Sequence, residues 1–574
     1  MNNTNLSKIF AQVADLLQIR GDNIHRVLSY RRAAETLSDL PHDISHIAEK
    51  GELTSIPGIG KTLAEKIEEI LATGELNFLN RLTDEIPITI LDLLKVEGMG
   101  PKRVKLVYDK LEVTSIELLE QAAESGELAN LPGMGKKSVE KIVAGISALR
   151  QFGNNRVRLG DALPAAEAIL AQLKQHPAVA KAAIGGSVRR RKETIGDIDL
   201  LVALHDNGEA GSVMQAFTTL DVVLEVATKG PTKSRIVLDN GIGVDLRVLP
   251  SENWGTLMSY FTGSQAHNVR LRELAKDKGL SLNEYAFSKI SGDEKILCAS
   301  EKDVYQVLDL PYIPPELRED RGEVEAAQQG KLPELITLNG IKGDLHMHST
   351  WSDGQHTIEE MAKAALALGH QYICITDHSY SLGIANGLTV DRLKAQREEI
   401  EQVREKVGDH LTILHGTEME VRADGALDFE DDVLEWLDFV IAAMHTGLKQ
   451  PREQVTERML NAIENPHVDM IAHPTGRLIG RRLGADLDIE KIIEAAARTQ
   501  TILEINANPA RLDLKDTHVK LALEQGVKIA INTDAHHVDQ LKLMDFGVAT
   551  GRRGWAMAEK VVNFWPIQQF LNFI

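Results

Sequence analysis

The chain has 574 residues, enough for about three to five domains with hydrophobic cores of their own. Hydrophobic residues make up 43% and charged residues 26%, as in ordinary soluble proteins, and a formal net charge of −20 argues against a globally basic protein that coats nucleic acid. A nucleic-acid enzyme is still compatible with this charge, because phosphate contacts depend on local patches and bound metals. Neither a signal-type N-terminus nor an apolar run of about 18 residues is found, so we expect a cytoplasmic protein without membrane contact. The two cysteines, Cys298 and Cys374, are expected to be reduced and buried.

Residues 1–80 carry apolar side chains at helical spacing. Ile9, Val13 and Leu17 follow this period, and a second set repeats it within residues 27–37. Side chains three and four residues apart lie on one face of a helix. We therefore predict that this part of the chain is mostly helical.

A short motif occurs three times in the first 150 residues: an apolar residue, then Gly-x-Gly, then Lys one or two residues later. The glycine pairs are Gly58 and Gly60, Gly98 and Gly100, and Gly133 and Gly135. Glycine permits a tight turn, after which backbone N–H groups at the next helix start can face a phosphate. One copy would also fit an ordinary helix–helix turn. Three copies favour helix-hairpin-helix motifs, which bind a DNA backbone without distinguishing bases.

The stretch 185–202 combines a glycine-rich turn with two carboxylates. Residues 198–204 are expected to form a buried strand, and its alternation puts Asp197 and Asp199 on the same face. Such carboxylates repel each other unless a cation lies between them, and hard oxygen ligands favour Mg²⁺. Backbone amides, a hydroxyl and a guanidinium in the turn suit a polyphosphate. These groups belong to Gly185, Gly186, Ser187 and Arg190. The combination indicates nucleotidyl transfer.

Residues 155–252 are expected to mix strands and helices around this stretch. Asp245 lies on a further, otherwise largely apolar strand over residues 243–249. A third carboxylate beside the first pair would complete a two-metal site, in which one ion activates a hydroxyl and the other binds a triphosphate. An acid on a solvated strand face is the alternative for Asp245. A helix-rich part follows from Tyr260 onward.

Residues 318–331 are charged, contain Gly and Gln, and show no apolar periodicity, so we expect a linker. From residue 341 to the end the sequence repeats one plan, in which a short apolar run ends in a polar residue and a helical stretch follows. Seven such strands alternating with helices predict a parallel barrel whose site gathers at the carboxyl ends of the strands. The runs cover residues 342–348, 372–378, 412–418, 439–445, 468–473, 501–506 and 528–536.

Six of the seven runs end with metal-ligand types of residue. One His at a strand end is more often a hydrogen-bonded core residue, but a set placed by one barrel plan favours a metal centre. Mixed imidazole and carboxylate ligands suit Zn²⁺, Mn²⁺ or Fe²⁺ better than Mg²⁺, and so many ligands predict two or three ions that support phosphoester hydrolysis. The candidates are His346, His348, Asp353, His378, Glu418, His445, His473, Asp534 and His536.

These motifs resemble two known families. Residues 1–318 resemble the X family of DNA polymerases, and residues 341–574 resemble the PHP (polymerase and histidinol phosphatase) domain. The resemblance implies a multidomain α+β and α/β fold with helical DNA-binding domains, a nucleotidyltransferase-type palm and a C-terminal (β/α)7-like barrel. The expected domains are a lyase-like 5′-phosphate domain (1–85), a helix-hairpin-helix domain (86–152), the palm (153–252), a nucleotide-selection subdomain (253–318), a linker (319–340) and the PHP domain (341–574).

The polymerase resemblance implies roles for residues in the palm and the subdomain after it. Asp197, Asp199 and Asp245 would hold two Mg²⁺ ions. Residues matching the family's nucleotide-binding positions are Gly186, Ser187, Arg190, Gly196, Tyr260, Phe261, Gly263, Asn268 and Arg272. Gln265 departs from polymerase beta, which has an acid near the base at that position.

In the first domain, the resemblance implies a pocket for a 5′-phosphate at a DNA gap. Lys66 matches the family's Schiff-base lysine, which removes 5′-deoxyribose phosphate, and Arg26 and Thr62 each replace a lysine of polymerase beta. The phosphate pocket would be formed by His25, Arg26, Tyr30 and Arg31.

PHP domains attached to such polymerases resemble Mn²⁺-dependent 3′→5′ exonucleases, some with abasic-site or 3′-end trimming activity. The resemblance therefore implies a repair enzyme that fills short gaps, as in base excision repair, with Mg²⁺ at the polymerase site and Mn²⁺ or Zn²⁺ at the PHP site. The partners would be gapped or primer-template DNA with a 5′-phosphate and dNTPs, and the protein a monomer. The alternatives are a nucleotidyltransferase on RNA or small molecules with a phosphatase of small phosphate esters, and a DNA-binding scaffold with inactive sites.

Overall fold

The computed structural model describes residues 3–96, 98–152, 156–205, 208–290, 292 and 294–574. It divides into two compact units, Met1–Asn155 and Arg156–Ile574. The domain boundary expected between residues 152 and 153 falls beside residues outside this description. Within the described residues, no helix is long and apolar enough to cross a membrane.

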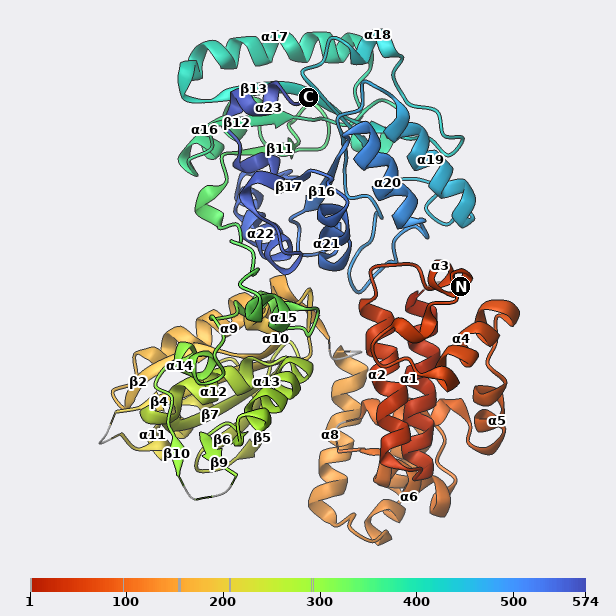
Figure 1. Cartoon of the computed structure of the whole chain (residues 1–574), viewed down its shortest axis with the longest axis vertical. Helices are drawn as coiled ribbons and strands as arrows, with labels where there is room; N and C mark the ends of the chain where they lie inside the picture. Colours follow the sequence, from red (N-terminus) through yellow and green to blue (C-terminus); the bar gives the residue numbers. More distant parts are fainter. Residues whose placement is uncertain (1–2, 97, 153–155, 206–207, 291, 293) are drawn as a thin grey trace. The chain divides into compact units, whose positions relative to one another are not determined.

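The first unit is helical, as its apolar spacing predicts. In α1 the side chains of Phe10, Val13 and Leu17 are fully buried, and this face packs against α2 (Figure 1). The helices are α1 (Asn3–Arg20), α2 (Ile24–Asp39), α3 (Ile44–Glu49), α4 (Lys61–Thr73), α5 (Asn77–Glu85), α6 (Pro101–Leu111), α7 (Ile116–Glu124) and α8 (Lys136–Phe152).

Each of the three Gly-x-Gly motifs forms a tight turn directly before a helix. The first glycine of each pair, Gly58, Gly98 or Gly133, has a positive φ of 83°, 88° or 75°, a conformation that residues with a Cβ rarely adopt. The second glycine precedes α4, α6 or α8. The residue between them is buried in every copy, whereas the second glycine is exposed. This is the geometry expected of helix-hairpin-helix motifs.

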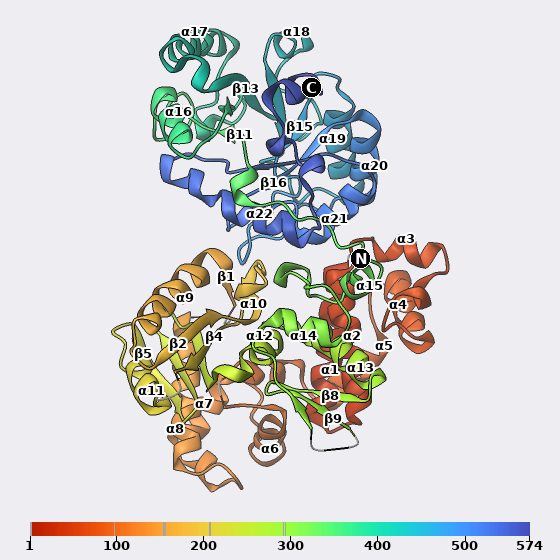
Figure 2. The same ribbon diagram turned by 60° about the vertical axis from the view of Figure 1, so that its left-hand side comes forward.

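The palm is a five-stranded sheet in the order β2-β4-β7-β6-β5. One face, with Ile198, Leu200 and Val202, packs on α9 and α11 (Figure 2). Because strand side chains alternate, Asp197 and Asp199 lie on the opposite face. The elements are β1 (Val157–Arg158), α9 (Leu159–Lys174), β2 (Val179–Ile184), α10 (Gly186–Arg189), β3 (Thr194–Ile195), β4 (Asp197–Leu204), α11 (Ala210–Thr218), β5 (Val223–Lys229), β6 (Lys233–Leu238) and β7 (Gly243–Pro250).

A smaller subdomain follows and continues into the stretch expected as a linker. Its elements are α12 (Trp254–Thr262), α13 (Gln265–Asp277), β8 (Leu280–Leu282), β9 (Phe287–Lys289), β10 (Lys295–Ile296), α14 (Glu301–Val307) and α15 (Glu323–Gln328). Helix α15 lies in the expected linker, yet Val324 and Ala327 are buried in this subdomain's core. Glu323 is also buried and accepts hydrogen bonds from His267 Nδ1 and two backbone amides. Two turns of helix are too short to show apolar periodicity, which explains why the sequence pattern did not reveal them.

The C-terminal part contains a parallel sheet of seven strands in sequential order, β11 to β17. A bridge between Met347 and Ala535 brings the two edges together, so the barrel is nearly closed. The strands are β11 (Gly343–Met347), β12 (Tyr372–Ile375), β13 (Thr412–Glu420), β14 (Phe439–Ala443), β15 (Met470–Ile471), β16 (Ile502–Asn506) and β17 (Ile529–Asn532). The predicted parallel barrel is confirmed.

Helices lie around the outside of these strands (Figure 1). They are α16 (Ile358–Ala367), α17 (Val390–Val407), α18 (Asp431–Leu434), α19 (Arg452–Glu464), α20 (Ile489–Thr499), α21 (Asp516–Glu524) and α22 (Met544–Arg553). The last helix, α23 (Ile567–Leu571), instead packs Phe570 against Tyr372 and Phe439 of the strands. Cys374 on β12 and Cys298 are both free and buried, as expected.

Candidate active sites

Three carboxylates come together at one end of the palm sheet. β4 and β7 are parallel, and their register pairs Asp199 with Asp245. Burial raises the pKa of Asp199 to about 7, and the neighbouring Asp197 and Asp245 add to the shift. A divalent cation bound between these carboxylates would neutralise their mutual repulsion and favour the ionised form of Asp199. One oxygen of Asp245, Oδ1, is buried without a hydrogen-bond partner among the described residues. The carboxylates therefore fit divalent metal ions.

Arg235 on β6 is a further charged member of this cluster. It forms ion pairs with Asp245 and, at 3.4 Å, with Asp197. The strand register places Arg235 directly opposite Asp245. This pairing was not predicted because strand register is not visible in the sequence, although alternation along residues 233–238 puts Arg235 on one face with Lys233.

The glycine-rich turn packs directly against the carboxylates. Gly186 has a φ of +58°, and a Cβ at this position would lie 2.0 Å from Oδ2 of Asp199. Ser187 lies in the short helix α10 that follows. The guanidinium of Arg190 already has partners within the protein. Its Nε donates to Glu319 at 3.0 Å and its Nη1 donates to the carbonyl of Thr262.

The expected nucleotide-selection residues form a second group at the end of α12 and on α13. The rings of Tyr260 and Phe261 meet edge to face at 5.2 Å, and Asn268 donates to the Tyr260 carbonyl at 2.7 Å. Tyr260, Asn268 and Arg272 line one small pocket. Gly263 approaches Arg190, because a Cβ there would lie 3.0 Å from Nη1 of Arg190. Gly196 lies immediately before β4, where a Cβ would make an ordinary contact with Arg156.

In the first unit, cationic side chains surround the ring of Phe78. The Lys66 Nζ atom lies 4.6 Å and the Arg26 guanidinium 4.8 Å from the ring centroid, and Arg81 lies 5.9 Å away. Burial lowers the pKa of Lys66; Arg81 and Arg26 lower it further, against the opposing effect of nearby glutamates. Tyr30 stacks on Phe78 at 6.0 Å.

Arg31 and His25 are not among the side chains that surround Phe78, although both were expected to bind the 5′-phosphate. Arg31 is engaged elsewhere, donating to Asp15 at 2.7 Å and to Gln18 at 2.9 Å. His25 is exposed near the start of α2. Phe78 and Arg81 lie beside Lys66 instead, and they were not predicted because both are on α5, distant in the sequence from residues 25–31.

All nine candidate ligands of the barrel gather at the carboxyl ends of its strands. Three sets have ligand atoms close enough to share an ion: His348, Asp353, His378 and His536; His346, His348, Glu418 and Asp534; and His378, Glu418 and His445. His473 completes the cluster, with Nε2 lying 2.9 Å from Glu418 Oε1. His473 and Asp534 have positive φ values of 27° and 53°, a strained conformation that is concentrated at functional sites.

The buried polar atoms of this cluster fit a metal centre. Within the described residues, the carboxylate oxygens of Glu418 and the ring nitrogens of His473 are buried and make no hydrogen bond of good geometry, although Nε2 of His473 lies within ion-pair distance of Glu418. Burial would raise the pKa of Glu418, yet the surrounding imidazoles, first His378 and His445, hold it well below its usual range. Burial and neighbouring histidines lower the pKa of His348 to about 3, which keeps this imidazole neutral, as a metal ligand must be.

A layer of carboxylates and amides orients these ligands. Glu420 accepts a hydrogen bond from Nδ1 of His445 at 2.7 Å. Glu504 pairs with Nδ1 of His346 at 2.8 Å, and Asn506 donates to Asp534 at 3.0 Å. Such partners fix the tautomer of a ligating imidazole. They were missed in the sequence, although an acid inside the apolar run 501–506 was a usable signal.

Two arginines lie beside the cluster. Nε of Arg511 is 3.9 Å from Oδ2 of Asp534. Arg482 donates to the carbonyl of Gly476 at 2.6 Å, three residues after the candidate ligand His473. Burial lowers the pKa of Arg482, and the positive charge of Arg511 adds to the effect. Two cations that repel each other beside metal ligands suit an anionic phosphate.

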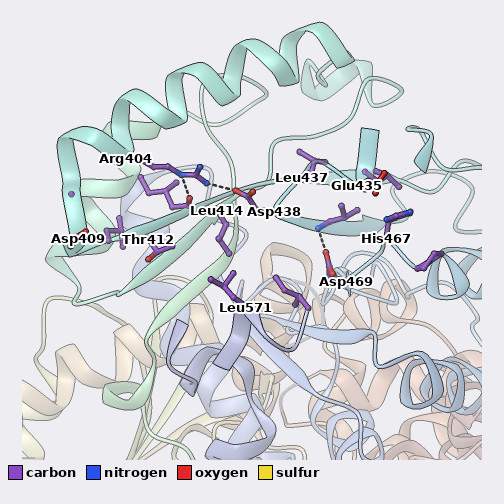
Figure 3. A pocket seen from close by; sticks show the side chains of 17 residues that line it. Arg404, Asp409, Thr412, Leu414, Glu435, Leu437, Asp438, His467, Asp469 and Leu571 are labelled. Atoms are coloured by element: carbon purple, nitrogen blue, oxygen red, sulfur yellow. Dashed lines mark hydrogen bonds and ion pairs between the residues drawn. The ribbon is translucent and has the colours of Figure 1, made fainter. Parts of the chain in front are cut away.

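A pocket of about 870 Å³ in the barrel lies apart from these ligands. It lies at the beginnings of β13 and β14, whereas the ligands lie at or beyond the ends of the strands. Three of its charged side chains already have partners, marked by dashed lines in Figure 3: Arg404 pairs with Asp438 at 2.6 Å, and Asp469 accepts from the Val440 amide at 2.7 Å. We assign no chemistry to it.

Comparison with known proteins assigns separate parts of the chain to different domain families. Four family models match: a helix-hairpin-helix domain at residues 1–76, a SAM-like helix-hairpin-helix tandem at 90–148, the DNA polymerase beta thumb at 257–319 and the PHP domain at 344–508.

Individual relatives match both halves. The DNA polymerase/3′-5′ exonuclease PolX of Bacillus subtilis is 40% identical over 100% of this chain and 99% of its own length. DNA polymerase lambda of Rattus norvegicus is 27% identical over 55% of this chain and 56% of its own. A probable phosphatase of Thermoanaerobacter sp. (strain X514) is 35% identical over 34% of this chain and 78% of its own. The chain therefore belongs to the PolX family, the family X DNA polymerases that carry a C-terminal PHP domain.

Proposed function

We propose that the protein is a DNA polymerase that fills short gaps during repair and carries a 3′→5′ exonuclease in its PHP domain. The observation that supports this most directly is the presence of two separate clusters in one chain: the Asp197, Asp199 and Asp245 carboxylates, and the His/Glu/Asp cluster around Glu418. The full-length similarity to a polymerase/3′-5′ exonuclease supports the same assignment.

For synthesis, Asp197, Asp199 and Asp245 would hold two Mg²⁺ ions. Metal ions held there would supply the positive charge that favours attack of the primer 3′-hydroxyl on the α-phosphate, with pyrophosphate as the leaving group. Gly186 lets the turn approach Asp199 closely, and Ser187 and Arg190 would bind the β- and γ-phosphates. Tyr260, Phe261, Asn268 and Arg272 would face the sugar and the primer-template minor groove. Gly196 would pack near the phosphates.

For hydrolysis, the barrel ligands would hold two or three ions, for which Mn²⁺ and Zn²⁺ suit the donor set. Ions held by these residues would supply Lewis-acid chemistry for hydrolysis of a phosphate ester by water. Glu420 and Glu504 hold the ligands His445 and His346 in orientation. Arg482 and Arg511 would bind the phosphate of the 3′-terminal nucleotide.

A lyase activity in the first unit is supported by the surroundings of Lys66. Its half-buried position and lowered pKa increase the fraction of neutral amine, which is the nucleophile of a Schiff base. Arg26 and Arg81 would hold the 5′-phosphate of the gap. The exposed hairpin glycines Gly60, Gly100 and Gly135 would contact the DNA backbone. We further propose a cytoplasmic monomer that takes dNTPs and gapped or primer-template DNA with a 5′-phosphate.

The test is a substrate comparison with the purified full-length protein. We expect incorporation of one dNTP on one-nucleotide-gapped DNA, faster with a 5′-phosphate at the gap than without it. We also expect Mn²⁺-dependent release of nucleotides from 3′ ends. Nucleotide addition to tRNA or a small molecule, with hydrolysis of small phosphate esters and no extension of DNA, would support the alternative and contradict the proposal.

A further inference from the structure

A loop of the palm next to the proposed polymerase site contacts the PHP domain. Residues 189–193 follow the glycine-rich turn and precede Asp197. Three residues of the PHP domain bond to this loop. Arg477 donates to Glu193 at 2.7 Å, Asp545 pairs with Arg191 at 3.3 Å, and Arg553 donates to the carbonyl of Arg190 at 2.7 Å.

Of these three PHP-domain residues, Arg553 is described next because its guanidinium contacts three different residues. Besides the Arg190 carbonyl, its Nη1 donates to Oε1 of Glu319 at 2.9 Å, and its Nη2 lies 2.8 Å from Asp516. Its side chain is only 4% exposed. A buried guanidinium with several charge-assisted bonds holds its partners in a narrow range of positions.

The same carboxylate oxygen of Glu319 also receives the Arg190 side chain, at 3.0 Å. Arg553 therefore holds Arg190 twice, through its backbone carbonyl and through the acid that binds its guanidinium. Burial would raise the pKa of Glu319, but the positive charges of Arg553, Arg190 and Lys192 lower it to about 2. It is thus an anion throughout the working pH range and remains a partner for both arginines.

We propose that Arg553, a residue of the PHP domain, is a positioning residue for the nucleotide-binding turn of the polymerase site and acts through Arg190 and Glu319. The inference rests on the proposed polymerase function. The PHP domain thereby contributes to dNTP binding as well as to its own hydrolytic reaction. Arg553 touches no reacting atom, so its removal should weaken nucleotide binding more than it slows the chemical step.

The experiment measures KM for dNTP and kcat on gapped DNA for Arg553→Gln, with nuclease rate and thermal unfolding midpoint in parallel. We expect KM for dNTP to rise about tenfold, the scale of one lost charge-assisted bond, while kcat changes less. Arg553→Lys keeps the charge and should recover part of the loss. Arg552→Gln is the matched control, because Arg552 bonds to Glu316 and the Ile336 carbonyl rather than to the turn; it should leave KM unchanged.

Two results would overturn the inference: an unchanged KM in Arg553→Gln, or an equal fall of synthesis, nuclease rate and unfolding midpoint in both Arg553→Gln and Arg552→Gln. If Arg553→Gln does not fold, Glu319→Gln tests the same link from the other side and should also raise KM. A wild-type KM in both Glu319→Gln and Arg553→Lys would then contradict it. Failure of the wild type to extend DNA would instead contradict the proposed function itself.

Discussion

Asp199 and Asp245 are register partners on the parallel strands β4 and β7, with the Gly186 turn packed on Asp199. Burial and the two neighbouring acids raise the pKa of Asp199 to about 7. In the metal-free protein the folded state therefore retains a proton that the unfolded state loses near the ordinary Asp pKa. The stability that this proton contributes is present at acidic pH and is lost as pH rises through about 7.

The first prediction concerns competition between this proton and the metal. Below pH about 7, Mg²⁺ must displace a proton from Asp199, so the Mg²⁺ concentration for half-maximal synthesis should be higher at pH 6 than at pH 8. Titration calorimetry at pH 6, in buffers of different ionisation enthalpy, should show proton release on Mg²⁺ binding. Asp199→Asn should abolish that release; release of the same size in the variant would contradict the assignment.

The second prediction tests the turn. Gly186→Ala should reduce synthesis on the order of a hundredfold, because its Cβ would lie 2.0 Å from Oδ2 of Asp199 and the φ of +58° disfavours alanine. The nuclease rate of the same variant is the control for folding, and it should stay at the wild-type value. Gly211→Ala, where a Cβ meets no atom within 4 Å, is the control. Synthesis at the wild-type rate in Gly186→Ala would show that the turn does not pack on the carboxylates during catalysis.

Local patterns in the sequence predicted much of this architecture, for physical reasons. The strands around Asp197 and Asp245, the hairpin glycines and the strand ends carrying barrel ligands follow from spacing within short segments. Arg235, Phe78 and Glu504 were missed because their roles depend on strand register or on packing between distant segments. The hydrogen bond between Arg553 and Glu319 could not be predicted from local patterns either, because 234 residues separate its two partners in the sequence.

The third prediction concerns the arginines beside the PHP ligands. Arg511→Gln should raise KM for DNA in the nuclease reaction about tenfold, since a charge-assisted phosphate contact is lost. Metal content should stay at the wild-type value, because Arg511 lies 3.9 Å from Asp534 and is not itself a ligand type of residue. Arg498→Gln on α20, where Arg498 pairs only with Glu464 among the described residues, is the control. An unchanged KM for DNA would exclude the contact.

The fourth prediction tests Lys66. Borohydride should trap a covalent adduct between the protein and DNA with a 5′-deoxyribose phosphate, and Lys66→Ala should abolish it, because the amine forms the Schiff base. Lys66→Arg keeps the charge above Phe78 but offers no such amine, so it should bind the DNA and form no adduct. An adduct of wild-type yield in Lys66→Arg would assign the nucleophile to another lysine.

The central claim is that one chain carries two independent metal sites, one that extends a 3′ end and one that removes it. The most direct measurement follows both reactions on the same gapped DNA, with Mg²⁺ and Mn²⁺ present, for Asp245→Ala and His346→Ala. Asp245→Ala should lower synthesis on the order of a thousandfold or more and leave hydrolysis intact, and His346→Ala should do the reverse. Loss of both reactions together in each folded variant would contradict the two-site account.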